Sequence, residues 1–297
     1  MIGRIHTIAA NDHEVHAPEG IFHCRFRKKL KRERQMTLKI AAVGDEVEFI
    51  STGAGEGMIE KVLERRSKLS RHDVHRPTHE QVIVANVDVL IVVQAAEDPP
   101  FNDLIVDQCT VMAAANGLPL LLVVNKSDLA RPDLSAYEST GYRCIRTSAK
   151  TGEGLEELRN TFKDRTSVVL GPSGVGKSSI LNAIDPKLGL KTGDVSLRGE
   201  GRHTTSWVEL VPAAGGLVAD TPGLEFFTLW GVTPENLKEY FLEFAEKAPG
   251  CRFRNCTHTT EEVCAVRTAY GESSRYRNYL EIRDRLRSRR ADLGDRR

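Results

Sequence analysis

A glycine-rich segment in the second half of the chain has the composition of a phosphate-binding loop. Residues 171–178 read Gly-Pro-Ser-Gly-Val-Gly-Lys-Ser and fit the pattern G-x-x-x-x-G-K-S/T. In this pattern backbone N–H groups converge on a phosphate, Lys177 reaches the β- and γ-phosphate oxygens, and the Ser178 hydroxyl binds Mg²⁺. An apolar run before the loop and a helix-like run after it supply the required strand–loop–helix context. The predicted nucleotide contacts are Gly171, Pro172, Ser173, Gly174, Val175, Gly176, Lys177, Ser178 and Ser179.

Two shorter segments, which precede this loop in the chain, predict that the base is guanine. Residues 125–128 read Asn-Lys-Ser-Asp, and residues 148–150 read Ser-Ala-Lys. The Asp128 carboxylate can accept hydrogen bonds from N1–H and from the exocyclic amine of guanine. Adenine has neither donor at these positions and would leave the carboxylate unpaired. The predicted contacts of the base are Asn125, Lys126, Ser127, Asp128, Ser148, Ala149 and Lys150.

The residues that would hold Mg²⁺ and the γ-phosphate lie after the phosphate-binding loop. The sequence Asp-Thr-Pro-Gly begins at Asp220, which would hold Mg²⁺ through water, and the Gly223 N–H would contact the γ-phosphate. Segment 199–206 lies between loop and motif, and we favour Thr205 over Thr204 as its magnesium ligand. The predicted magnesium ligands are Ser178, Thr205 and Asp220.

Leucine at position 224 leaves the attacking water without an obvious partner. Many GTPases have a glutamine there, and leucine cannot orient water. His203 is the best-placed substitute by sequence, although the same pattern fits an ordinary surface histidine. The predicted catalytic residues are His203, Lys177 and Gly223. Turnover is therefore expected to be slow until a partner orders the loop that carries His203.

Three cysteines and a histidine cluster within fourteen residues near the C-terminus. Their pattern is Cys-x4-Cys-x-His-x5-Cys, and such a set suits a closed tetrahedral structural Zn²⁺. Ordinary buried thiols and a disulfide are the alternatives, and a cytoplasmic chain disfavours the disulfide. The predicted zinc ligands are Cys251, Cys256, His258 and Cys264. Neighbouring arginines could contact an RNA backbone.

The pattern of apolar and polar residues changes twice along the chain and predicts a multidomain α/β protein. Short alternating runs at the N-terminus predict a small β-barrel, most plausibly an OB-fold, and the polar segment 68–80 predicts a linker. Apolar runs that alternate with helical ones, including 103–115 and 155–162, then predict a mostly parallel sheet with helices on both faces. Helices are expected at 235–245 and 274–287. The predicted domains are a barrel at 1–70, a phosphate-binding α/β domain at 71–232 and a helical zinc domain at 233–297.

The net charge of +1 conceals two basic ends and an acidic centre. Residues 1–76 hold 15 Lys and Arg against 11 Asp and Glu, a net of +4, and residues 251–297 hold 12 against 7, a net of +5. Basic flanks suit a polyanion such as RNA, although solvated surfaces explain them equally well. No apolar stretch reaches the length of a membrane span, and the N-terminus lacks the apolar core of a signal peptide. We expect a cytoplasmic monomer that binds no membrane.

The order of these motifs, the sequence Gly-Arg-His-Thr-Thr at 201–205 and the spacing of the zinc ligands resemble the RsgA family. That family comprises circularly permuted GTPases of small-ribosomal-subunit biogenesis, and the resemblance covers nearly the whole chain. It implies an OB-fold, a permuted GTPase domain and a zinc domain that bind the 30S subunit and its 16S rRNA, with other assembly factors as further partners. It also implies GTP hydrolysis to GDP that the subunit stimulates and that drives release, with His203 as the catalytic residue.

Two other functions fit the same residues. One is an RNA-independent regulatory GTPase that acts on a protein partner, with incidental basic flanks. The other is an RNA-binding protein in which the nucleotide only stabilises the fold. Turnover measured with and without ribosomal subunits separates the three.

Overall fold

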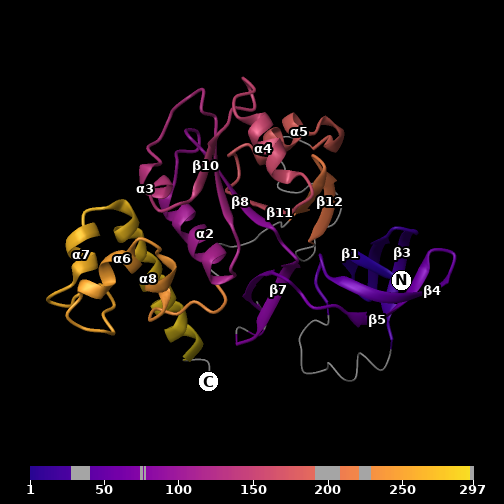
Figure 1. Ribbon diagram of the computed structural model, residues 1–297, viewed down its shortest axis with the longest axis horizontal. Helices are drawn as coiled ribbons and strands as arrows, with labels where there is room; N and C mark the ends of the chain where they lie inside the picture. The colour runs from indigo at the N-terminus through magenta and orange to yellow at the C-terminus, as the bar shows by residue number, and fades with distance from the viewer. Residues whose placement is uncertain (28–40, 74–75, 77, 191–207, 221–228, 295–297) are drawn as a thin grey trace.

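The computed structural model describes residues 1–27, 41–73, 76, 78–190, 208–220 and 229–294, with the side chains of Asp220 and residues 290–294 outside the description. Figure 1 shows three parts side by side: an N-terminal barrel, a central sheet with helices, and a helical C-terminal part. In the described part of the chain, no helix is both long and apolar enough to cross a lipid bilayer.

The N-terminal part is a closed five-stranded barrel, which agrees with the prediction of an OB-like fold. The strands follow one another around the barrel in the order β1-β2-β3-β5-β4, and β4 pairs back onto β1. Only β3 and β5 run parallel. Alternate apolar side chains, among them Val15, Phe22, Phe49 and Ile59, fill its interior. The strands are β1 (Ile2–Ala9), β2 (Asp12–Ala17), β3 (Gly20–Phe26), β4 (Glu46–Gly53) and β5 (Glu56–Val62).

A two-stranded hairpin follows the barrel, so the prediction of a linker over 68–80 was wrong. Strand β6 (Lys68–His72) pairs antiparallel with β7 (Glu80–Ala85). The polar residues that suggested a linker pair across the hairpin: Lys68 forms an ion pair with Glu80 at 2.6 Å, and Arg71 donates to Gln81. The proposed domain boundary after residue 70 therefore falls inside β6.

The central sheet has the order β10-β9-β8-β11-β13-β12, and only the edge strand β12 runs antiparallel to its neighbour. Helix α2 (Asp103–Ala115) packs on one face of the sheet, and α4 (Leu155–Phe162) and α5 (Lys177–Ile184) pack on the other. Because the five parallel strands end at one edge, the loops that follow them meet there. The strands are β8 (Val89–Ala95), β9 (Leu120–Asn125), β10 (Arg143–Arg146), β11 (Thr166–Leu170), β12 (Glu209–Ala213) and β13 (Gly216–Asp220).

The barrel continues the central sheet through its edge strand. Thr7 of β1 pairs with Glu209 of β12, which joins barrel and sheet into one array of eleven strands. His6 Nδ1 lies 3.1 Å from the carbonyl of Leu210 on β12, and its ring stacks on His16 at a centroid distance of 3.6 Å. Burial, together with the neighbouring His16, lowers the pKa of His6 to about 4, so this ring is neutral at pH 7.

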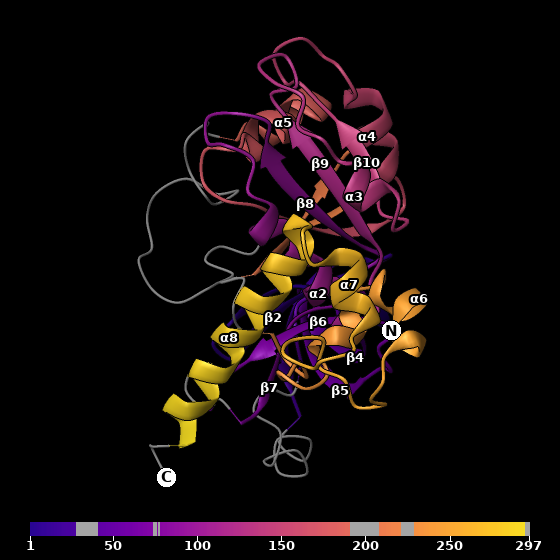
Figure 2. The same cartoon turned by 90° about the vertical axis from the view of Figure 1, so that its left-hand side faces the viewer.

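The C-terminal part is helical, and its long last helix packs on α2. Helix α8 (Ser274–Gly294) runs away from this part toward the C-terminus (Figure 2). The predicted helix over 235–245 is broken: the backbone is extended at Phe241, and the rings of Phe241 and Phe244 both contact Tyr279. The shorter elements are α3 (Ser135–Glu138) in the central part, η1 (Pro186–Leu188), η2 (Leu237–Tyr240), α6 (Phe244–Lys247), η3 (Ala248–Gly250) and α7 (Ala265–Tyr270).

A buried ion-pair network fixes α8 to α2. Arg275 donates to Asp107 of α2 at 2.6 Å and to Glu243 at 2.6 Å, and Asn278 donates to the second oxygen of Asp107 at 2.7 Å. The Arg275 guanidinium also lies 4.9 Å from the ring centroid of Tyr137. Complete burial raises the pKa of Asp107 to about 7, although Arg275 and Asn278 oppose the shift. Asp107 and Glu243 share the single positive charge of Arg275, so removal of the arginine should destabilise the fold more than removal of either carboxylate.

We therefore predict unequal effects for two substitutions in the network. Arg275→Met leaves two buried carboxylates without a cation and should lower the free energy of unfolding by about 3–5 kcal/mol. Asp107→Asn leaves Arg275 paired one-to-one with Glu243 and should cost only about 1 kcal/mol. Urea denaturation of both variants measures the difference, and equal losses would contradict the shared-cation description.

A comparison of wild type with Asp107→Asn also tests the raised pKa of Asp107. A carboxyl whose pKa is higher in the folded than in the unfolded chain binds a proton on folding, so it favours the fold more as the pH falls from about 7 to about 4. Wild type should therefore gain stability relative to Asp107→Asn between pH 8 and pH 5.

Candidate nucleotide and metal sites

The phosphate-binding loop lies between β11 and α5, in the strand–loop–helix arrangement that the sequence predicts. Residues 171–176 form the loop, and Lys177, Ser178 and Ser179 form the first turn of α5. Gly176 has a φ of 90°, and a Cβ atom there would lie 2.3 Å from Asn125 Nδ2. The Lys177 ammonium donates to the carbonyls of Gly171 and Pro172, at 2.7 Å each. The Lys177 side chain therefore lies along the loop with which it is predicted to bind phosphate.

Asn125, the last residue of β9, holds three loops together. Its Nδ2 donates to the carbonyl of Val175 in the phosphate-binding loop at 2.9 Å. Its Oδ1 accepts from the backbone N–H of Ala149 at 3.3 Å and from the Thr147 hydroxyl at 3.5 Å. The amide is buried, so these bonds are shielded from water. One side chain thus brings together the two segments predicted to read the base and the segment predicted to bind phosphate.

Asp128, three residues after Asn125, is exposed, so its carboxylate can accept hydrogen bonds from a ligand. The Ser148 hydroxyl donates to Asp128 Oδ1 at 2.7 Å, and this bond lowers the pKa of the carboxyl. The carboxylate is therefore ionised at pH 7, as recognition of guanine requires. Lys150 follows Ala149 in the turn beyond β10, and its charge also favours the ionised form.

Two supporting groups escaped the sequence analysis. Glu153 accepts from the Ser127 hydroxyl at 2.7 Å and from Arg131 at 2.7 Å, which braces the segment that carries Asp128. The Lys126 ammonium donates to the carbonyl of Asp98 in the loop after β8. That loop has no recognisable motif, and a glutamate in a turn is common, so neither residue gave a signal in the sequence.

Part of the predicted magnesium and catalytic set lies outside the described residues. This holds for His203, Thr204, Thr205, Gly223 and Leu224. Asp220 ends β13, and β13 pairs in parallel with β11, whose end leads into the phosphate-binding loop. The backbone of Asp220 is therefore at the same sheet edge as that loop, as a magnesium ligand would need to be.

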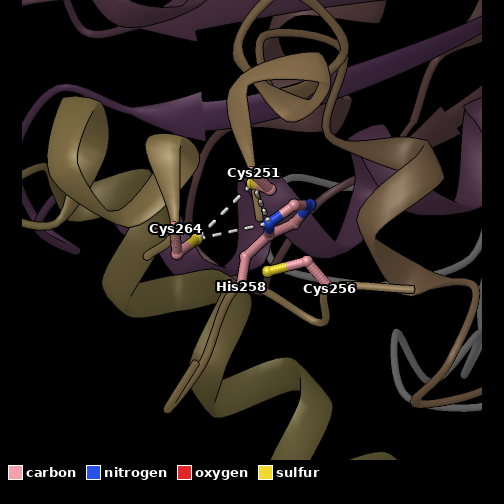
Figure 3. Close-up of side chains that lie close together, drawn as sticks. All are labelled: Cys251, Cys256, His258 and Cys264. Carbon is pink, nitrogen blue, oxygen red and sulfur yellow. Dashed lines mark hydrogen bonds between the residues drawn. The ribbon is translucent and has the colours of Figure 1, made fainter. Parts of the chain in front are cut away.

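The four predicted zinc ligands converge on one point (Figure 3). Their ligand atoms all lie within 4.8 Å of one another. His258 Nδ1 lies 3.6 Å from Cys251 Sγ and 3.5 Å from Cys264 Sγ, and the two sulfurs are 3.9 Å apart. Tetrahedral zinc with Zn–S bonds of about 2.3 Å requires sulfur–sulfur distances of about 3.8 Å. The set, completed by Cys256, therefore fits a closed structural zinc site.

The surroundings favour the metal-binding forms of Cys251 and His258, whereas burial raises the pKa of Cys256 to about 12 and favours its protonated thiol. Although burial opposes ionisation, backbone N–H groups of Val266 and Ala265 at the start of α7 lower the pKa of Cys251. Burial lowers the pKa of His258 and keeps its imidazole neutral. Tyr276 donates to the carbonyl of His258 at 2.6 Å, which fixes the backbone behind the ring.

Comparison with known proteins identifies the family. A sequence model described as RsgA GTPase matches residues 62–230, more than half of the chain. The chain belongs to the RsgA GTPase family. It is 37% identical over 287 residues to the small ribosomal subunit biogenesis GTPase RsgA of Halalkalibacterium halodurans, covering 92% of this chain and 93% of that protein. It is 41% identical over 290 residues to the protein of the same name from Gemmatimonas aurantiaca, covering 93% and 94%.

Solved structures show the same architecture. The crystal structure of YjeQ from Thermotoga maritima has a TM-score of 0.77 at 35% identity, covering 96% of this chain and 98% of that one. YloQ, titled a circularly permuted GTPase, has a TM-score of 0.73 at 30% identity, covering 97% and 95%. As a member of the RsgA family this protein is a GTPase. The segments predicted to read the base precede the predicted phosphate-binding loop because β8, β9 and β10 precede β11 in the chain.

The contact between Gly176 and Asn125 predicts that a single methyl group disrupts the nucleotide site. Gly176→Ala should weaken GTP binding at least about tenfold, because the new Cβ displaces the Asn125 amide and frees the loop, a cost of about 1.4 kcal/mol or more. Gly189→Ala is the matched control, since Gly189 also has positive φ but nothing within 4 Å of its Cβ position. Titration with a fluorescent GTP analogue measures both, and equal weakening would show that backbone strain alone is responsible.

The cluster geometry predicts one zinc ion per chain. Cys264→Ser should abolish zinc binding and lower the thermal unfolding temperature, because the metal contributes to folding of the loop that surrounds it. Cys144→Ser, in an isolated half-buried thiol, should leave the zinc content at one. Elemental analysis of the purified proteins is the measurement, and a metal-free wild type would refute the assignment.

Proposed function

We propose that this protein binds the small ribosomal subunit, assists its late maturation and leaves when GTP is hydrolysed. The observation that carries the proposal is the convergence on Asn125 of the base-reading segments and the phosphate-binding loop, in a chain whose relatives are named small ribosomal subunit biogenesis GTPases. The site is built for a guanine nucleotide, and the two flanking parts supply surfaces for a large partner.

In this proposal the nucleotide residues have separate tasks. Asp128 binds the base edge, the stem of Lys126 lies along the base plane, and a backbone N–H of residues 148–150 reaches guanine O6. The phosphate-binding loop and Lys177 hold the phosphates. The remaining roles fall mostly on residues outside the description, together with the described Ser178. Thr205 and Asp220 complete the magnesium shell with Ser178, the Gly223 N–H contacts the γ-phosphate, and His203 orients the attacking water.

The flanking parts are the proposed contacts with the subunit and its 16S rRNA. The barrel and the C-terminal part lie on opposite sides of the central sheet, so a surface that touches both must be broad (Figure 1). Residues 1–76 and 251–297 carry net charges of +4 and +5, which suits a phosphate backbone. The zinc ion would keep the C-terminal loops in a binding conformation. We place the protein in the cytoplasm as a monomer. After hydrolysis the GDP-bound protein leaves the matured particle, on which other assembly factors also act.

Turnover with and without ribosomal subunits tests the proposal. Purified small subunits should raise the rate of GTP hydrolysis at least about tenfold, because a partner that orders the catalytic loop lowers the barrier by about 1.4 kcal/mol or more. Large subunits should not, ATP should not be hydrolysed, and Lys177→Ala should abolish turnover in every case. Equal rates with and without small subunits would instead support an RNA-independent GTPase with a protein partner.

A further inference from the structure

One aromatic side chain of the C-terminal part faces solvent. Phe253 is 43% exposed, and among the described residues it is the only Phe, Tyr or Trp in the exposed class. Other aromatic residues nearby, such as Phe241, Phe244 and Tyr279, are buried against one another. An exposed phenyl ring keeps part of its apolar surface in contact with water, so a ligand that covers the ring gains stabilisation.

The chain holds Phe253 on a short, fixed loop between two of the predicted zinc ligands. Residues 252–255 are all exposed, whereas Cys256 at the end of the loop is buried. The Cys256 N–H donates to the carbonyl of Phe253 at 3.1 Å, and the Arg252 N–H donates to the carbonyl of Val263 at 3.1 Å. These bonds hold the backbone of the loop, so a ligand would not have to order the backbone that carries the ring.

Arginines precede and follow Phe253 in the chain, and one guanidinium lies over its ring. The Arg252 guanidinium lies 5.5 Å from the centroid of the Phe253 ring, and Arg254 follows directly on the same exposed loop. Arg252 has an acidic neighbour, Glu262, at 3.8 Å, but both side chains are largely exposed and the pair is correspondingly weak. The loop thus combines one aromatic face with two positive charges.

We propose that Phe253 stacks on an unpaired RNA base while Arg252 and Arg254 contact the adjacent phosphates. An exposed aromatic ring with arginines on the same loop suits single-stranded nucleic acid, since each base offers a π-face and each nucleotide a negative charge. A protein partner is less well matched, because Phe253 and Val263 are the large exposed apolar side chains of the described residues between 251 and 264, which is small for an interface core. The inference rests on the proposed function, which supplies ribosomal RNA as the ligand.

Three substitutions at position 253 separate stacking from other contacts. Phe253→Ala and Phe253→Leu should each weaken binding to purified small subunits by about 5- to 150-fold, the range for loss of one stacked base. Phe253→Trp should bind at least as tightly as wild type. Leu242→Ala removes another exposed apolar side chain of the same part and should leave the affinity unchanged. Zinc content and thermal unfolding should not change in any of the four variants, because both side chains are exposed.

Each outcome has a distinct meaning. If Phe253→Leu binds like wild type while Phe253→Ala does not, the ring makes an apolar contact with protein and the inference is wrong. If all three variants bind like wild type, Phe253 makes no contact and the inference fails while the proposed function stands. If wild type does not bind the subunit, the proposed function itself fails. Chemical probing gives a direct readout: wild type should protect an unpaired base of the rRNA that Phe253→Ala leaves reactive.

Discussion

The nucleotide site depends on the hydrogen bonds of one buried amide. Asn125 ends β9, Val175 lies in the loop after β11, and Ala149 lies in the loop after β10, so the side chain joins three strand ends. These contacts depend on which strands are neighbours and not on their order in the chain. A sheet that keeps its neighbours therefore keeps the site when the chain order is permuted. Position 176 must be glycine for these contacts to form, because a side chain there would overlap the Asn125 amide.

Permutation decides which part of the molecule each predicted switch segment adjoins. Strand β12, which follows segment 191–207 in the chain, pairs with β1 of the barrel. Strand β13 leads through segment 221–228 toward the C-terminal part, which begins near η2. Each flanking part is thus connected, through pairing or through the chain, to one of the two segments expected to contact Mg²⁺ and the γ-phosphate. In the unpermuted order, segment 221–228 would lead into the strands that correspond to β8, β9 and β10 and not into the C-terminal part.

Local patterns in the sequence predicted the elements that carry chemistry, while long-range polar pairing stayed hidden. Helices α2, α4 and α5, the barrel and the convergence of three cysteines and a histidine all follow from spacing and periodicity, and the structure has them where they were predicted. Phosphate binding by the loop after β11 and zinc binding by the cluster stay predictions. The hairpin β6–β7 was missed because polar residues usually indicate a loop, and here they pair across strands. Likewise, Arg275 is 168 residues from Asp107, and no local pattern shows that two distant charged residues will be buried together.

The orientation of the C-terminal part relative to the nucleotide site depends on that distant pair. The predicted zinc ligands fix the loops around them, but they lie within fourteen residues of one another and place nothing relative to the sheet. Arg275 does so by joining α8 to α2. Helix α2 begins at its cap Asn102, directly after the loop in which Asp98 accepts a hydrogen bond from Lys126 of the segment predicted to read the base. One helix therefore connects the predicted guanine end of the site with the part that carries Phe253, so a movement of α2 against the sheet would displace both.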